Sequence, residues 1–78
     1  MKRIITYDLK QGNTSDYQEL CNVFKVLNGT QLTESSYVIN TSLSQEKIKK
    51  MIKDVIYSDD IVYYISVNQN GELFYSKI

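Results

Sequence analysis

Residues 61–67 read Ile-Val-Tyr-Tyr-Ile-Ser-Val, which is the most strand-like stretch of the sequence. β-Branched and aromatic side chains favour extended backbone, and successive side chains of a strand point to opposite faces of a sheet. The odd-numbered residues from Ile61 to Val67 therefore share one face, and the even-numbered residues from Val62 to Ser66 share the other. Both faces carry apolar or aromatic side chains, so this strand decides how the remaining elements must pack.

The strand is predicted to continue into a hairpin. Asn70-Gly71 is a strong hairpin signal, because both central positions of a type I′ turn need a positive φ. A last strand is then expected over residues 73–78.

Two amphipathic helices are predicted upstream. The first begins at Ser15, and Gln18, three residues later, completes a capping box. One apolar face follows at helical spacing, made of Tyr17, Leu20, Cys21, Phe24 and Leu27. Asn28-Gly29 is expected to end this helix, with Gly29 in the left-handed conformation.

The second helix is predicted to begin at Ser44. Its apolar face repeats the same spacing with Ile48, Met51, Ile52, Val55 and Ile56. The polar run 58–60 is expected to end it as a loop rather than to bind a metal.

Two further segments complete the element order. Residues 2–8 are predicted to form a strand, and residues 30–40 a pair of strands with a bulge or turn at Glu34-Ser35. The order β-α-β-β-α-β with an additional strand predicts an α+β protein. We expect one domain over residues 1–78, with a ferredoxin-like arrangement, an extra C-terminal strand and two helices on one face of an antiparallel sheet.

Composition excludes several classes of function. Nine basic residues balance nine acidic ones, and this zero net charge argues against DNA binding by bulk electrostatics. The absence of His excludes His-containing catalytic triads and His-ligated zinc, and one Cys cannot form an intrachain disulfide. No apolar run is long enough for a membrane span or a signal peptide. We therefore expect a cytoplasmic protein with no membrane partner, in which Cys21 is a small buried side chain.

The second face of the sheet raises the question of a partner. Two helices can cover only one face, and a chain this short buries only about 60% of its unfolded surface. Seven tyrosines in 78 residues also suit an interface, although the rings could instead pack at the sheet edges. The predicted interface of a homodimer consists of Tyr7, Tyr37, Tyr63, Tyr64 and Phe74.

A resemblance to a known family rests on two short stretches. The run Ile-Ile-Thr-Tyr-Asp-Leu at residues 4–9 is similar to the first strand of the Cas-two family, the small CRISPR-associated adaptation proteins. Residues 32–39, followed by Leu43-Ser44 and a Lys-rich helix, resemble the short SinR-like branch of that family. The virulence-associated protein D ribonucleases are a more distant relative. The likeness covers nearly the whole chain in element order.

This resemblance implies a site at the end of the first strand. In Cas-two proteins the Asp that ends this strand is the proposed catalytic and metal-binding residue, one from each subunit of a dimer, and Asp8 matches it. Tyr7 lies beside it, and Ser36 matches the small hydroxyl residue that opens the third strand, so all three are candidate catalytic residues. Paired carboxylates can hold Mg²⁺, which can activate water against a phosphodiester. The alternative role for Asp8 is to cap a turn.

Lysines provide the candidate nucleic-acid contacts. Lys10 is near Asp8, and the second helix contributes Lys49, Lys50 and Lys53. The alternative is that these helix lysines form a solvated face. Residues 12–18 carry no positive charge, unlike the corresponding loop of many Cas-two members, and this departure argues against a strong nuclease.

Two functions follow from the sequence. The first is a Cas-two-like homodimer that associates with nucleic acid, with a weak Mg²⁺-dependent endonuclease or endoribonuclease activity if it is an enzyme. The second is a non-catalytic module on the same dimer scaffold, which binds another protein as a structural subunit or inhibitor.

Overall fold

The computed structural model describes residues 2–10 and 14–78 of the chain. Its elements, in chain order, are β1 (Lys2–Asp8), α1 (Thr14–Val26), β2 (Gly29–Thr33), β3 (Ser36–Asn40), α2 (Gln45–Lys53), β4 (Ile61–Val67) and β5 (Leu73–Lys77). This is the predicted element order, and α1 begins at Thr14, one residue before the expected position. Among the described residues, neither helix has the length and apolar character to cross a membrane.

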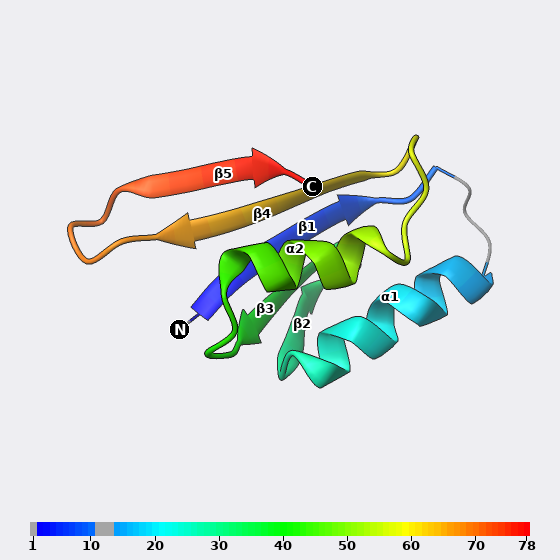
Figure 1. Ribbon diagram of the computed structural model, residues 1–78, viewed down its shortest axis with the longest axis horizontal. Coiled ribbons are helices and arrows are strands. Elements are labelled where there is room, and N and C mark those ends of the chain that lie inside the picture. The colour runs from blue at the N-terminus through cyan, green and yellow to red at the C-terminus, as the bar shows by residue number, and fades with distance from the viewer. Residues whose placement is uncertain (1, 11–13) are drawn as a thin grey trace.

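The strands form one antiparallel sheet in the order β2-β3-β1-β4-β5. The prediction of an α+β protein with two helices and an antiparallel sheet is therefore confirmed. Both helices lie on the same side of the sheet, and the β4–β5 hairpin projects beyond the N-terminal end of α2 (Figure 1). β1 is central, and β2 and β5 form the two edges.

The hydrophobic core lies between the sheet and the two helices. Phe24 of α1 is fully buried, and its ring stacks on that of Tyr37 with the centroids 4.3 Å apart. The other buried apolar side chains come from both layers: Ile5, Tyr7, Leu20, Leu27, Ile39, Ile48, Ile52, Val62 and Tyr64. Val62 and Tyr64 lie on the covered face of β4, which agrees with the alternation read from the sequence. Burial of such side chains contributes most of the stability of a small domain.

On the opposite face of the sheet, here called the open face, the described part of the chain places no helix. One row of directly paired residues crosses all five strands: Thr30, Val38, Ile4, Ile65 and Tyr75. A second row contains Ser36, Thr6, Tyr63 and Lys77. The first row is mainly apolar, so the open face has the composition of a surface that can be covered.

The β4–β5 hairpin differs from the predicted type I′ turn. Only Gly71 has a positive φ, of 82°, whereas a type I′ turn needs positive values at two residues. Gly71 N donates to the Asn68 carbonyl over 3.1 Å, and the Asn68 side chain accepts from Asn70 N and Glu72 N, both over 2.9 Å. The Asn68 carboxamide therefore organises a longer loop, and Gly71 takes its left-handed position.

The C-terminal end of α1 also differs from the expectation. Asn28 takes the left-handed conformation, with a φ of 56°, while Gly29 does not. Asn tolerates this region because its short polar side chain can bond locally. Gly29 is required for space instead, because a Cβ there would lie 2.8 Å from the backbone carbonyl oxygen of Phe24.

α2 ends at Lys53, earlier than the apolar pattern predicts. Ser44 caps its start as expected, with its Oγ accepting from Lys47 N over 3.2 Å. Val55 N bonds to the carbonyl of Ile52, three residues back, which tightens the last turn. Val55 and Ile56 still pack against the core, so burial without helical geometry explains why their spacing looked helical.

Candidate nucleic-acid site at the carboxyl end of β1

Asp8 is the last residue of β1, where the alternation of the strand directs its side chain to the open face. Its carboxylate is well exposed and accepts a hydrogen bond from Lys10 Nζ over 2.8 Å. This contact, and the further negative charge of Asp59, raise the pKa of the Lys10 ammonium. Lys10 is thus a firmly charged partner that neutralises Asp8.

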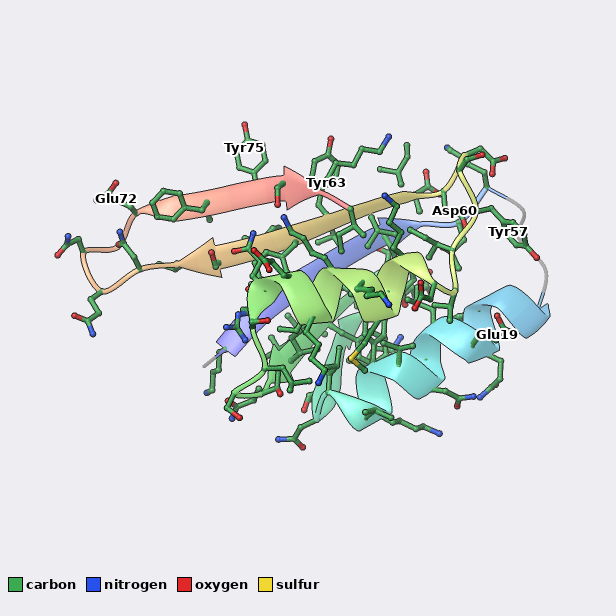
Figure 2. All side chains as sticks on the ribbon, in the orientation of Figure 1. Glu19, Tyr57, Asp60, Tyr63, Glu72 and Tyr75 are labelled. Carbon is green, nitrogen blue, oxygen red and sulfur yellow. The ribbon has the colours of Figure 1, made fainter. Side chains whose placement is uncertain are left out.

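The Asp60 side chain binds the backbone of Lys10, the residue that pairs with Asp8. It is 3% exposed, and its two carboxylate oxygens accept from Lys10 N and from Tyr57 N, each over 2.8 Å. Figure 2 shows Tyr57 and Asp60 at this end of the molecule, in the loop before β4. The carboxylate therefore ties the segment after β1 to the segment after α2. The prediction that residues 58–60 form a loop after the second helix agrees with the structure.

A cavity of about 420 Å³ lies beside this clamp. Its lining consists of Lys53 and Lys77, the apolar Ile56 and Ile78, Tyr57, Ser58 and Asp60 itself. Lysine side chains at such a cavity can contact a phosphate, and a tyrosine ring can stack on a base. Lys53 comes from the last turn of α2 and Lys77 from the end of β5, so the topology brings distant residues together.

Tyr7 and Ser36, the other candidate catalytic residues, are engaged elsewhere. Tyr7 points to the covered face, where its hydroxyl donates to the Glu34 carbonyl over 3.1 Å and lies 3.4 Å from the Tyr17 hydroxyl. Burial, with these contacts, raises the pKa of Tyr7 far above its usual range. Ser36 is buried, and its hydroxyl lies 2.7 Å from that of Thr33. The structure therefore does not bring the Tyr7 hydroxyl to Asp8, although the two residues are neighbours in the sequence.

The four candidate nucleic-acid lysines do not form one patch. Lys10 pairs with Asp8, and Lys53 lines the cavity at the same end of the sheet. Lys49 lies against the sheet, where its ammonium bonds to Ser76 Oγ and lies 5.4 Å from the Tyr64 ring centroid. Lys50 is exposed on α2. Of the four, Lys10 contacts Asp8, and Lys53 belongs to the lining of the cavity on the helix side of the sheet.

The five predicted interface residues divide between the two faces of the sheet. Tyr7 and Tyr64 are buried in the core, and Tyr37 is half-buried against Phe24 and Cys21, whose Sγ lies 3.5 Å from the Tyr37 hydroxyl. Tyr63 lies on the open face, where its ring is 6.4 Å from that of Tyr75. Phe74 is exposed on the hairpin. The tyrosines thus serve the core and the open face alike.

Asp8 is the candidate Mg²⁺ ligand of this site, and Asp59 is a further carboxylate close enough to act on Lys10. Within residues 2–10 and 14–78, no three His, Cys, Asp or Glu side chains come together as a ligand group. Mg²⁺ keeps several waters and needs only one or two carboxylates, so Asp8 fits as a ligand if a second copy supplies another. Asp60 does not fit, because both of its oxygens accept backbone hydrogen bonds.

Sequence reasoning did not find Lys77, Tyr57 or the role of Asp60. Lys77 is an isolated charge at the end of a strand, and only the strand order shows that it lies beside the end of α2. The Tyr57 ring is half-exposed just beyond α2. In comparisons with known proteins, no family model matches the chain, and no curated protein matches its sequence.

Proposed function

We propose that this chain is a homodimeric, nucleic-acid-associated protein of the Cas-two-like type, which works in the cytoplasm. The observation that supports it best is the cavity lined by Lys53, Lys77 and Tyr57, which the Asp60 side chain connects to the segment that carries the Asp8–Lys10 pair. The order β2-β3-β1-β4, with both helices on one face, supports a ferredoxin-like arrangement that β5 extends by one strand.

Single-stranded nucleic acid is the ligand that suits this cavity. Lys53 and Lys77 can each contact a phosphate, and Tyr57 offers a ring face on which an unpaired base can stack. The volume of about 420 Å³ suits one nucleotide rather than a duplex. Balanced overall charge limits non-specific attraction, so local contacts must supply the affinity.

The dimer is proposed to form through the open face. Val38, Ile4, Ile65 and Tyr75 make an apolar row across four strands, which a second copy can cover. Five strands about 4.8 Å apart and about 20 Å long give roughly 500 Å² of projected area. A standard interface uses about 800 Å² per partner, so we expect a weak dimer with a micromolar or higher Kd. Asp8 lies at the end of this face, where two copies can pair their carboxylates.

Binding tests the nucleic-acid role. We expect the double variant Lys53→Gln/Lys77→Gln to bind a short single-stranded RNA more weakly than the native chain in fluorescence anisotropy. Each lost phosphate contact lowers the slope of log K against log salt by about 0.7, so the double variant should lose about 1.4. Lys25→Gln, an exposed change in the last turn of α1, should leave the slope unchanged. Equal slopes for all three proteins would contradict the proposed site.

Cleavage tests the catalytic part separately. In a dimer the two Asp8 carboxylates would hold Mg²⁺, which supplies Lewis acidity and an activated water. Purified protein should then cleave RNA or DNA in the presence of Mg²⁺, and Asp8→Asn should stop it. Unchanged cleavage by Asp8→Asn would remove the assigned role, while the binding test would still stand on its own.

A non-catalytic module is the second candidate, and one contact favours it. Lys10 already neutralises the Asp8 carboxylate, which lowers its attraction for a metal ion. The scaffold would then serve as a structural subunit or inhibitor of another protein. Purification from the native host should recover one specific protein partner, and a chain without such a partner that cleaves nucleic acid would exclude this candidate.

A further inference from the structure

We propose that β5 pairs edge to edge with β5 of a second copy, antiparallel and with the two-fold axis at Phe74. The pairing would join two five-stranded sheets into one continuous sheet. It uses the outer edge of the sheet rather than the open face, and it does not depend on the proposed nucleic-acid role.

The two edges of the sheet differ in how well they can accept another strand. β2 carries one exposed apolar side chain, Leu32, among polar ones, and its register with β3 shifts between Gln31 and Thr33. Such an irregularity protects an edge against further pairing. β5 is in regular register with β4 throughout and carries three exposed apolar side chains: Leu73 at 60%, Phe74 at 52% and Tyr75 at 69%. An unprotected apolar edge of this kind indicates a surface for strand addition.

The hydrogen-bond pattern shows which backbone groups of β5 point outward. At one end of the strand Asn68 N donates to the Glu72 carbonyl, and at the other Ile78 N donates to the Val62 carbonyl. Hydrogen-bonded pairs alternate along an antiparallel ladder, so the even-numbered residues of β5 bond to β4. The N–H and C=O groups of Leu73, Tyr75 and Lys77 therefore face the outer edge.

A two-fold axis at Phe74 satisfies this pattern with apolar partners on both faces. Leu73 of one copy lies opposite Tyr75 of the other, and these pairs exchange about four backbone hydrogen bonds. Phe74 lies opposite its own copy in a non-hydrogen-bonded pair, the closer of the two pair types, which suits two aromatic rings. An axis at Tyr75 would instead place Leu73 opposite Lys77 and leave Phe74 opposite Ser76.

Charge also favours the axis at Phe74. In that register Glu72 lies opposite Ser76 of the second copy, whose hydroxyl accepts from Lys49 Nζ in its own chain. Glu72 is exposed at the end of the hairpin, and Figure 2 shows it there together with the outward Tyr75. The pairing thus brings each Glu72 carboxylate within reach of the Lys49 ammonium of the other copy, and this happens twice by symmetry.

Cysteine cross-linking tests the register. In a Cys21→Ser background, Phe74→Cys should form a disulfide-linked species of twice the 9.1 kDa chain mass under mild oxidation. Facing residues of such a pair lie within disulfide distance. We expect the cross-link to form about tenfold or more faster than with the exposed control Ser42→Cys, because pairing raises the local thiol concentration. Faster cross-linking of Tyr75→Cys, or a Phe74→Cys rate equal to the control, would overturn the proposal.

A proline substitution in β5 tests the edge pairing without cysteine cross-linking. Tyr75→Pro removes an outward N–H that β4 does not use, so the sheet should tolerate it. Tyr75→Thr keeps that N–H and is the matched control. In sedimentation, we expect Tyr75→Pro to lose self-association through the edge and Tyr75→Thr to keep most of it. Equal self-association of the two variants, with both folded by circular dichroism, would contradict the pairing.

A charge exchange tests the predicted contact. Glu72→Lys should weaken edge association about two- to five-fold, and Lys49→Glu in the same chain should restore it.

A further variant distinguishes pairing at the β5 edge from dimerisation through the open face: Ile65→Thr is combined with Phe74→Cys. Cross-linking should persist in that variant even if the face-to-face dimer is lost, whereas its disappearance would show that the edge pairing does not exist independently.

Discussion

Replacing Asp60 with asparagine should remove one of the two bonds that clamp the candidate site. The carboxylate of Asp60 is almost fully buried, and each of its oxygens accepts a backbone N–H over 2.8 Å, one from Lys10 and one from Tyr57. An asparagine of the same size keeps one acceptor oxygen but places its NH₂ group against the other N–H. One hydrogen bond is then lost, and a buried donor is left without an acceptor.

The size of the effect follows from these two contacts. A hydrogen bond to a charged group contributes about 1.5–3 kcal/mol, and an unsatisfied buried donor costs about 1–3 kcal/mol. Because these terms overlap, we expect the free energy of unfolding to fall by about 2–3 kcal/mol. A chain of 78 residues has about 4–12 kcal/mol in total, so the loss is substantial. The Tm should fall by about 8–20 °C.

Urea and thermal denaturation, both followed by circular dichroism, measure this change. Glu19→Gln is the matched control, because it removes the same charge from an exposed position on α1 and should change stability by less than about 0.5 kcal/mol. A loss below about 1 kcal/mol for Asp60→Asn, or equal losses for both variants, would refute the clamp.

Three further predictions concern stability. Above about pH 10 the unfolded chain loses tyrosine protons while buried Tyr7 keeps its own, so the free energy of unfolding should fall by at most about 1.4 kcal/mol per pH unit for this residue. Urea titrations should show a shallower fall for Tyr7→Phe, and an unchanged slope would contradict its burial. Gly29→Ala should cost more than Gly71→Ala in the same assay, because a Cβ at Gly29 meets backbone at 2.8 Å whereas Gly71 has space and only a positive φ. Ser44→Ala should cost about 1 kcal/mol through loss of the α2 cap, and a neutral result would contradict that contact.

The sequence was sufficient for the order and type of the elements. Alternation in residues 61–67 predicted that Val62 and Tyr64 share one face of the strand, and the structure confirms this and shows that this face is the covered one. The ends of helices and strands were harder to predict, because the spacing of apolar residues does not show where the backbone hydrogen bonds of an element stop. The Val55–Ile56 pair continues the apolar spacing of α2, yet Asp60 holds the following backbone in another conformation.

The candidate site was less accessible from the sequence than the fold. Asp8, Lys10 and Lys53 were identified from a strand end and from a basic helix, and the structure places them at the same end of the sheet. Lys77 and the clamp at Asp60 depend on contacts between residues far apart in the chain, which no local pattern encodes. Tyr7 was predicted to act with Asp8 because the two are neighbours in the sequence. In a strand, however, neighbouring side chains point to opposite faces, so Tyr7 lies on the face opposite to Asp8.

The most direct test of the proposed function is an NMR titration of the ¹⁵N-labelled chain with a short single-stranded RNA. We expect amide shifts to concentrate at Lys10, at residues 57–61 and around Lys77, and to weaken with added salt. Shifts confined to β2 and the C-terminal end of α1, or no shifts at all, would contradict a nucleic-acid site at this end of the sheet.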